Sequence, residues 1–216
     1  MKNKKIIKLY KKLLKTYGEP ESQWKLWCKR PAYGEARRGR PKNIHDREEV
    51  IIGAILTQRA NWKNVILAID NLKKAKIYTL SGIYKLGLKN KNKLADLIRP
   101  SGFYKQKCEY LMEMAKFFKK SGGIKNVQQI ELKELREKLL DLHGVGPETA
   151  DSILLYVLDK PIFVIDEYTR RLVKKEKLAR DLSYDYLQKL FESNLPRDFA
   201  LYQDFHALIV IDGKNN

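Results

Sequence analysis

The sequence predicts an all-α protein with two helical lobes. Apolar residues recur at spacings of three and four along most of the chain, and no stretch alternates apolar and polar residues as a half-buried strand would. Hydrophobic residues form 44% of the 216 residues, which is ordinary for a globular chain. That length allows one substantial core or two small lobes that share a groove.

The chain is strongly basic. Lysine and arginine number 44 against 26 acidic residues, which gives a formal net charge of +18. Such an excess fits a polyanionic partner held by salt-sensitive contacts with phosphates, although a lysine-rich proteome would explain it too. The two cysteines, Cys28 and Cys108, are far apart and suggest neither a disulfide framework nor a zinc site. No apolar run approaches the length of a membrane span, and Lys8 interrupts the N-terminal apolar run, so no signal peptide is expected.

The first part of the chain should form a helix, an aromatic segment and a loop. Residues 1–17 carry an apolar stripe at helical spacing, and a glycine and a proline then end the helix. Trp24 and Trp27 follow, and their ordinary role would be a core pair. The loop 32–45 contains RGRP at 38–41, which resembles the core of an AT-hook, a minor-groove binder. Simple phosphate attraction or a solvated loop explains the same residues.

Four helices with apolar faces are predicted next, at 46–56, 62–74, 80–88 and 90–98. A proline–glycine turn, RPSGFYKQK at 99–107, then presents backbone amides together with Lys105 and Lys107. It opens another helix, which the glycine pair at 122–123 ends. This pair is the expected seam inside the chain.

A helix–hairpin–helix unit is centred on LHGVGP at 142–147. Leucines at helical spacing precede it in 132–140, and a second apolar stripe follows in 150–158. Two glycines two residues apart allow a tight turn with positive φ, and Pro147 suits the first turn of the second helix. The hairpin amides and the positive end of the second helix dipole therefore form an uncharged cradle suited to phosphate.

Asp166 ends the short apolar run PIFVI at 161–165 and stands where the N-cap of the next helix belongs. An aspartate in this place is usually only a cap. Its separation of about twenty residues from the hairpin nevertheless allows a grip on a DNA strand and a fixed carboxylate to belong to one site. Two further helices are predicted, at 184–195 and 200–209, and His206 in the second is expected to be a packed core histidine.

These motifs together resemble the endonuclease III-like DNA glycosylase superfamily (HhH-GPD). The matching residues are LHGVGPETA at 142–150, followed by Ile165-Asp166, and the resemblance extends from about Glu49 to Gly213. It implies a DNA-binding cleft between the lobes, with Asp166 as the catalytic carboxylate that stabilises an oxocarbenium-like sugar and orients or deprotonates the attacking water. It also implies that the hairpin residues bind DNA, namely His143, Gly144, Val145, Gly146 and Thr149.

One departure from the pattern concerns the reaction. Bifunctional relatives carry a catalytic lysine two residues after the second hairpin glycine, where this chain has Glu148. A carboxylate cannot form a Schiff base with the sugar, so the resemblance implies a monofunctional glycosylase that leaves an abasic site. The branch that removes 3-methyladenine has Glu at this place, and Thr149-Ala150-Asp151 fits its setting. The alternatives are a uracil or thymine mismatch glycosylase, a bifunctional glycosylase/lyase, and a non-catalytic DNA-binding protein.

The resemblance assigns further residues to DNA and to the damaged base. Gln58 matches the residue that fills the space left by an extruded nucleotide, and Arg59 could contact a phosphate or the orphaned base. Gly102, Lys105 and Lys107 match a segment that contacts the DNA backbone. Aromatic faces at the base pocket would favour electron-poor, cationic bases. The three candidates for this pocket are Trp24, Trp27 and Trp62.

The remaining expectations concern cofactors and organisation. Many relatives bind an iron–sulfur cluster through four cysteines, and two cysteines cannot do so, so no cluster is expected. A structural monovalent cation would be held by the carbonyls of Leu140, Leu142 and Val145. The expected lobes are 1–79 with 159–216, and 80–158. The expected protein is a cytoplasmic, nucleoid-associated monomer that binds double-stranded DNA containing a damaged base and does not bind membranes.

Overall fold

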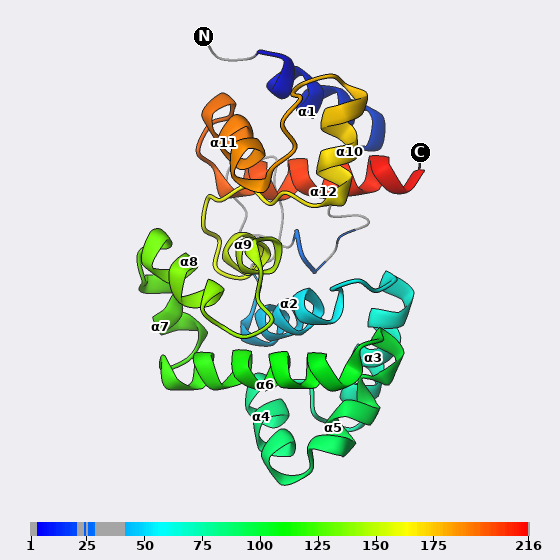
Figure 1. Cartoon of the computed structure of the whole chain (residues 1–216), viewed down its shortest axis with the longest axis vertical. Coiled ribbons are helices and arrows are strands. Elements are labelled where there is room, and N and C mark those ends of the chain that lie inside the picture. Colours follow the sequence, from blue (N-terminus) through cyan, green and yellow to red (C-terminus); the bar gives the residue numbers. More distant parts are fainter. Residues whose placement is uncertain (1–3, 21–23, 25, 29–41, 216) are drawn as a thin grey trace. The chain divides into compact units, whose positions relative to one another are not determined.

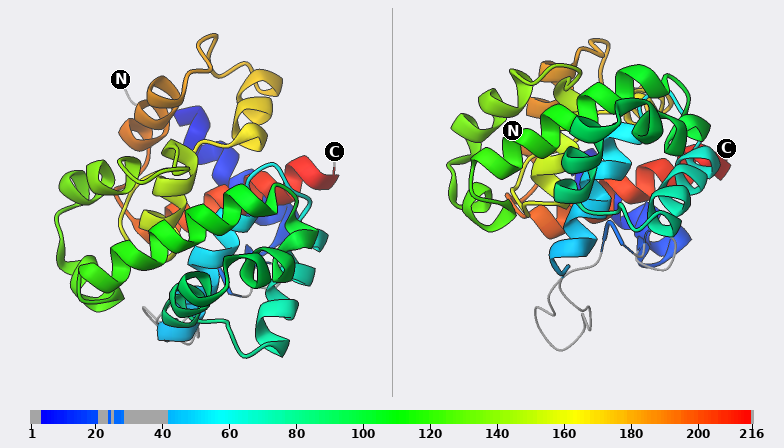
Figure 2. Two further views of the ribbon diagram at one scale, coloured as in Figure 1. Left: turned by 60° about the horizontal axis from the view of Figure 1, so that its bottom comes forward. Right: turned by 90° about the horizontal axis from the view of Figure 1, so that it is seen from below.

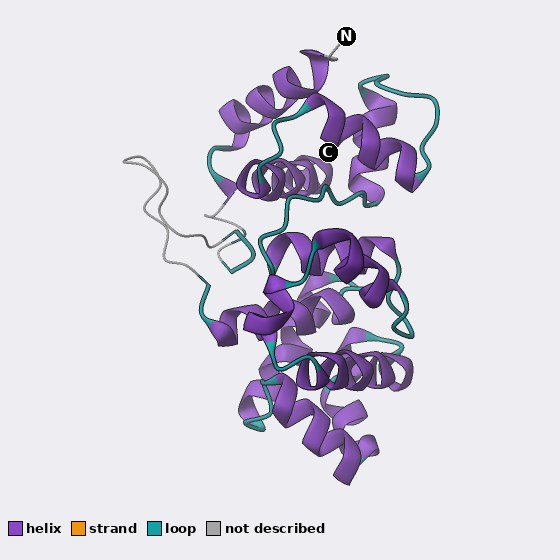
Figure 3. Cartoon of the chain, turned by 90° about the vertical axis from the view of Figure 1, so that its left-hand side faces the viewer, coloured by secondary structure: helices purple, strands orange, loops and turns teal. Residues whose placement is uncertain are grey.

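The computed structural model describes residues 4–20, 24, 26–28 and 42–215. All regular secondary structure in these residues is helical, with no strand among them, as Figures 1 and 3 show. The predicted all-α class is therefore confirmed. The RGRP segment at 38–41, which resembles an AT-hook, lies outside the described residues.

The chain divides into two compact units, and the central unit is continuous in sequence from Asn43 to Ile153. Its helices are α2 (Ile44–Leu56), α3 (Trp62–Lys74), α4 (Leu80–Lys89), α5 (Lys91–Leu97), the short 3-10 helix η2 (Arg99–Ser101), α6 (Tyr104–Lys120), α7 (Ile124–Gln129), α8 (Leu132–Leu140) and the first part of α9 (Pro147–Tyr156). The long helix α6 packs against α2, α4 and α5, and Figure 2 shows it in green crossing this unit. Its buried face includes Leu111, Met114 and Phe118, so α6 supplies the centre of the core.

The terminal unit joins the two ends of the chain, residues Met1–Lys42 and Leu154–Asn216. It contains α1 (Lys4–Tyr17), the end of α9, α10 (Glu167–Lys175), α11 (Tyr184–Asn194) and α12 (Phe199–Asn215). Helix α12 packs against both α1 and α10. Phe163 stacks on Phe191 with ring centroids 4.4 Å apart, and Phe205 lies against both rings. Burial of each such ring contributes about 1.5–3 kcal/mol, so this cluster anchors α11 and α12 to the chain before α10.

The unit boundaries differ from those expected from the sequence. Helices α2 and α3, within the expected terminal lobe 1–79, belong to the central unit because they contact each other, α6 and η2. The glycine pair at 122–123 is not a seam, since it only joins α6 to α7 with φ values of 77° and 91°. One boundary instead falls inside α9, between Ile153 and Leu154. Hydrophobic periodicity identified which face each helix buries, but not which neighbour covers that face.

No helix in the described part of the chain is both long enough and apolar enough to cross a membrane.

Candidate active site and DNA-binding surface

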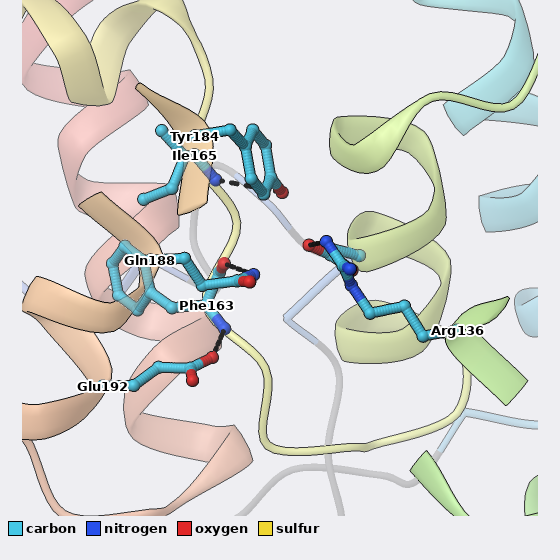
Figure 4. Close-up of polar contacts among 7 residues, drawn as sticks. Arg136, Phe163, Ile165, Tyr184, Gln188 and Glu192 are labelled. Atoms are coloured by element: carbon cyan, nitrogen blue, oxygen red, sulfur yellow. Dashed lines mark hydrogen bonds and ion pairs between the residues drawn. The ribbon is translucent and has the colours of Figure 1, made fainter. Parts of the chain in front are cut away.

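The extended segment before Asp166 is held by side chains of α11. Glu192 accepts a hydrogen bond from the Phe163 N–H (2.8 Å), and Gln188 Nε2 donates to the Phe163 carbonyl (2.8 Å). A longer contact of 3.5 Å joins the Ile165 N–H to the Tyr184 hydroxyl. Tyr184, Gln188 and Glu192 lie four residues apart on one face of α11, as Figure 4 shows. Because the segment has no sheet partner, these side chains satisfy the hydrogen-bonding groups of its buried backbone and fix the position of Asp166.

Asp166 is the N-cap of α10, as predicted, and is 8% exposed. Its Oδ1 accepts hydrogen bonds from the Thr169 N–H (2.7 Å) and the Thr169 hydroxyl (2.8 Å). Its Oδ2 lies 3.4 Å from Nε2 of His206. Burial alone would raise the pKa of Asp166, but the neighbouring His206 and the two Thr169 hydrogen bonds outweigh it and hold the pKa below its usual value. The carboxylate is therefore ionised at neutral pH, with one oxygen committed to the cap.

Within the terminal unit, aromatic side chains lie next to His206, the histidine beside Asp166. The Trp24 ring meets the His206 ring edge-on at 6.1 Å and lies 5.9 Å from the Tyr156 ring. Trp27 lies 5.8 Å from Trp24 and 5.2 Å from Tyr156. Both tryptophans are half-buried. The structure thus separates Trp24 from Asp166 by one side chain, His206, and places Trp27 behind Trp24 and Tyr156.

The third predicted pocket residue belongs to the central unit. Trp62 is the first residue of α3, and 36% of it is exposed. Ile66, one turn further along the same helix, is 43% exposed. Trp62 is therefore a surface aromatic of the central unit and packs less tightly than Trp24 and Trp27.

The polar residues behind this aromatic group were not identified from the sequence as site residues. Tyr156, in α9, places its hydroxyl 2.7 Å from Nδ1 of His206 and 3.2 Å from the carbonyl of Gln203. Gln203 Nε2 donates to the Leu155 carbonyl at 2.7 Å. The signal that could have revealed them is the run of polar residues inside α12, where Gln203, Asp204 and His206 are all buried.

The hairpin between α8 and α9 has the predicted helix–hairpin–helix connection. Gly144 has φ +82°, and a Cβ built on it would overlap the ring of Tyr110. Gly146 is not in the left-handed region, so only one of the two glycines needs the conformation expected for both. The Val145 N–H donates to the Leu142 carbonyl at 3.1 Å and is lost to the anion cradle. No described residue accepts a hydrogen bond from the N–H of Gly144 or Gly146, so these two amides are the donors left for the predicted anion cradle.

Gln58 contacts the hairpin, 86 residues away in sequence. Its Nε2 donates to the Gly144 carbonyl (2.9 Å) and to the Thr149 hydroxyl oxygen (3.1 Å). Thr149 is 8% exposed, and its hydroxyl braces the hairpin through Gln58, so its contact with DNA stays a prediction. Gln58 is half-buried with its amide nitrogen bonded to the protein, whereas the sequence suggested a side chain that enters the duplex. The neighbouring Arg59 is exposed and has φ +49°. The hairpin residue His143 is also exposed.

Lys107 is not a DNA contact, which corrects the prediction. It is 2% exposed, and its ammonium donates to the carbonyls of Leu56 (2.8 Å) and Ser101 (2.7 Å). Burial lowers the pKa of Lys107 to about 8. The side chain therefore ties the end of α2 to η2 and fixes the two loops that follow these helices. Periodicity could not reveal this, because both acceptors are backbone atoms supplied by folding.

The turn that Lys107 supports is itself exposed. Gly102 (φ +69°) and Lys105 lie on the surface, where the sequence placed them. Between them, Phe103 is 59% exposed and has φ +45°, an unusual conformation for a residue with a bulky side chain. An exposed aromatic held in a strained turn is a functional candidate that the sequence analysis missed.

The pH dependence of stability tests the environment of Lys107. Its pKa is about 8 in the fold against 10.5 for an ordinary lysine, so the unfolded chain binds more protons between these pH values. The contribution of Lys107 to the free energy of unfolding should therefore rise with pH in that window, and this gain should be absent below pH 8. From pH 8 to 10.5, wild type should gain about 2–3 kcal/mol in free energy of unfolding relative to Lys107→Met. Urea denaturation at several pH values measures the gain.

The matched control is Lys105→Met, which replaces an exposed lysine on the same turn. Its difference from wild type should not change across the same pH range. A Lys107→Met difference that is equally flat would contradict the burial of a charged ammonium at this place.

Comparison with known proteins identifies the family. The model of the HhH-GPD superfamily of base excision DNA repair proteins matches residues 52–197. The chain belongs to this superfamily. The protein MJ1434 of Methanocaldococcus jannaschii, described by its name as a DNA repair glycosylase, is 39% identical over 211 residues, covering 95% of this chain and 85% of that protein.

Two solved structures are similar to this chain over its whole length. The 3-methyladenine DNA glycosylase MagIII of Helicobacter pylori, bound to 1,N6-ethenoadenine, has a TM-score of 0.76 and 29% identity, covering 100% of this chain and 98% of that chain. A trapped covalent intermediate of endonuclease III with DNA has a TM-score of 0.72 and 18% identity, covering 100% of this chain and 88% of that chain. The second likeness concerns the fold alone.

Glu148 marks how this HhH-GPD protein departs from the bifunctional pattern. It is exposed in the first turn of α9, two residues after Gly146. Nearby, Asp151 is fully buried and receives two hydrogen bonds from Arg136, one from Nε (2.8 Å) and one from Nη2 (3.1 Å). Figure 4 labels Arg136. This bidentate pair joins α8 to α9 and sets the spacing of the two helices around the hairpin.

Two cofactors come into question for an HhH-GPD protein, an iron–sulfur cluster held by cysteines and a monovalent cation held by hairpin carbonyls. The sequence contains two cysteines, both buried, with Cys28 in the terminal unit and Cys108 in the central unit. Two thiols do not fit a four-thiolate iron–sulfur cluster. At the hairpin, the Leu142 carbonyl already accepts a hydrogen bond from Val145, which leaves it one lone pair for a cation. The monovalent cation at Leu140, Leu142 and Val145 stays a prediction.

Proposed function

We propose that this HhH-GPD protein is a monofunctional DNA N-glycosylase that removes alkylated purines from DNA. The observation that carries the proposal is the setting of Asp166, an ionised carboxylate fixed at a helix N-terminus next to His206, which the half-buried Trp24 contacts. A fixed negative charge stabilises the positive charge that develops on the sugar when the base departs. Preorganisation matters here because the dipoles are already in place before the reaction.

The reaction would be a hydrolysis. The bond between C1′ and the base nitrogen breaks with its electron pair leaving on the nitrogen, and a water oxygen forms the new bond to C1′. Asp166 orients that water and can take its proton, which then passes to solvent. An alkylated purine already carries positive charge and is therefore a good leaving group. Faces of Trp24 and Trp27 favour such a cationic base over a neutral one.

Glu148 supports a reaction that stops at the abasic site. A Schiff base with the sugar requires an amine nucleophile, and the carboxylate of Glu148 cannot supply one. The Helicobacter pylori relative, whose name records activity on 3-methyladenine, is similar over the whole of this chain. Together these observations favour alkylpurine removal over removal of uracil or thymine, bases that carry no positive charge.

DNA would be held through the central unit. The amides of Gly144 and Gly146 offer two donors to a phosphate, and Arg59 and Lys105 add exposed positive charge. Extrusion of a nucleotide costs stacking energy, which an inserted apolar side chain can offset. Phe103 is the exposed aromatic that could be inserted, and Lys107 would hold its turn in place.

A panel of labelled duplexes tests the proposal. Each would carry one of 3-methyladenine, uracil, hypoxanthine, 8-oxoguanine or thymine glycol. We expect base release from the 3-methyladenine duplex, with strand cleavage only after alkali, and no protein–DNA adduct after borohydride. Release from the uracil duplex alone would assign the protein to the alternative class. A borohydride-trapped adduct would contradict the monofunctional assignment, and a lack of release from every duplex would contradict the glycosylase itself.

A further inference from the structure

A buried polar pair lies directly behind the catalytic carboxylate. His206, from α12, is 5% exposed and places Nδ1 2.7 Å from the hydroxyl of Tyr156. Its other ring nitrogen, Nε2, is buried, makes no hydrogen bond of good geometry within the described part of the chain, and lies 3.4 Å from Oδ2 of Asp166. A buried polar atom without a partner is costly, so the approach of Nε2 to the carboxylate calls for an explanation.

Counting protons limits the states of this pair. If His206 carried its proton on Nδ1 alone, the lone pair of Nε2 would face a carboxylate oxygen and repel it. The neutral ring therefore carries its proton on Nε2, and Tyr156 donates to Nδ1. If the ring is doubly protonated, Tyr156 instead accepts from Nδ1 and donates to the Gln203 carbonyl, 3.2 Å away. In both permitted states the Nε2 atom of His206, which lies 3.4 Å from Oδ2, carries a proton.

We infer that His206, oriented by Tyr156, is a positioning residue that holds Asp166 ionised and aimed for base release. The inference rests on the proposed function of Asp166. Thr169 fixes one carboxylate oxygen, and His206 faces the other. Without the imidazole, the second oxygen would be buried with no donor beside it among the residues that the structure describes. A protonated or turned carboxyl group could neither stabilise a positive sugar nor take a proton from water.

Other groups around the pair define the electrostatics. Among the described residues, Tyr156 from α9 hydrogen-bonds to His206, and Lys214 from the last turn of α12 interacts electrostatically with Asp166. Burial lowers the pKa of Lys214, and the charge of Asp166 only partly opposes this. The Trp24 ring covers one edge of His206 and limits the access of water to it. His206 and Thr169 are therefore the groups that favour the ionised carboxylate of Asp166.

Single-turnover base release measured against pH tests the inference. His206→Phe keeps a ring of similar volume but removes both nitrogens, so the pKa of Asp166 should rise. Because release needs ionised Asp166, the acid limb of the profile should move up by about one pH unit, with a plateau reduced about tenfold. His206→Gln retains an N–H donor and should recover part of both effects. Tyr156→Phe, which loses the hydroxyl that orients His206, should fall between wild type and His206→Phe.

Two measurements separate positioning from a merely structural role. DNA affinity and thermal stability identify any variant that has lost its fold. His206→Phe added to Asp166→Asn should cause no further loss of release, because the imidazole acts through Asp166. A His206→Phe profile whose acid limb coincides with that of wild type, in a folded variant, would overturn the inference.

A readout independent of activity distinguishes this inference from the proposed function. The chain has three histidines, so single variants assign each ring in a ¹⁵N spectrum. Wild-type His206 should show a protonated Nε2, and Asp166→Asn should change its ring shifts while those of His45 and His143 stay unchanged. If no duplex of the panel releases a base, the proposed function fails while this spectrum still tests the pair. A neutral His206 protonated only on Nδ1, or unaffected by Asp166→Asn, would overturn the inference.

Discussion

Asp166→Asn should abolish base release while DNA binding and folding are retained. The substitution removes the negative charge that, in the proposed mechanism, stabilises the sugar, but it keeps the shape of the side chain. Loss of one preorganised electrostatic group typically costs a factor of about 10²–10³ in rate, and here the same group also orients the water, so we expect at least a thousandfold loss. Single-turnover release from the 3-methyladenine duplex measures it.

The fold should tolerate this substitution because asparagine caps helices as well as aspartate does. The side-chain carbonyl of Asn can accept the two hydrogen bonds that Thr169 now gives to Oδ1. Glu167→Gln is the matched control, since it removes an exposed carboxylate from the next position. The control should release the base as wild type does. Full activity in Asp166→Asn would remove the assignment of Asp166.

Gly144→Ala should disrupt the hairpin more than Gly146→Ala does. The backbone at φ +82° is unfavourable for alanine by about 1–2 kcal/mol, and the new Cβ would overlap the Tyr110 ring. Overpacking of this kind adds about 1–3 kcal/mol, so the free energy of unfolding should fall by about 3 kcal/mol. DNA affinity should also fall, because the displaced hairpin no longer aims its amides at one phosphate.

Two further variants identify the cause of the Gly144→Ala effect. Gly146→Ala adds a methyl group where no atom lies within 4 Å and φ is not positive, so its free energy of unfolding should change by less than about 1 kcal/mol. Gly144→Ala combined with Tyr110→Ala removes the overlap but leaves the strained φ, and should recover only part of the stability of a Tyr110→Ala reference. Equal stability of Gly144→Ala and Gly146→Ala would contradict this account of the hairpin.

The local features of the site were accessible from the sequence because local rules determine them. The spacing of apolar residues predicts α8 and α9, and the glycines between them predict the turn. The end of an apolar run at a polar helix predicts Asp166 as an N-cap, and the Thr169 hydrogen bonds confirm it. Each of these inferences needs only residues within a few turns of one another.

The features that escaped the sequence analysis depend on contacts over long separations. Gln58 bonds to the hairpin across 86 residues, and Lys107 bonds to the Leu56 carbonyl across 51. Tyr156 and His206 meet across 50 residues. The resemblance of the 99–107 segment to one that contacts the DNA backbone assigned Lys107 to DNA, because the distant carbonyl that accepts its hydrogen bond is not apparent from the sequence. The unit boundaries failed for the same reason, since α2 and α3 are placed by their partners α6 and η2.

The division of the chain also determines an order of assembly during synthesis. The central unit is one uninterrupted stretch, Asn43 to Ile153, so a ribosome delivers all of it before any of α10, α11 or α12 has emerged. Helix α1, although made first, must wait for α12 nearly two hundred residues later before its apolar face is covered. Closing so long a loop is slow. The unit that carries the helix–hairpin–helix is therefore complete early in synthesis, and the unit that carries Asp166 matures last.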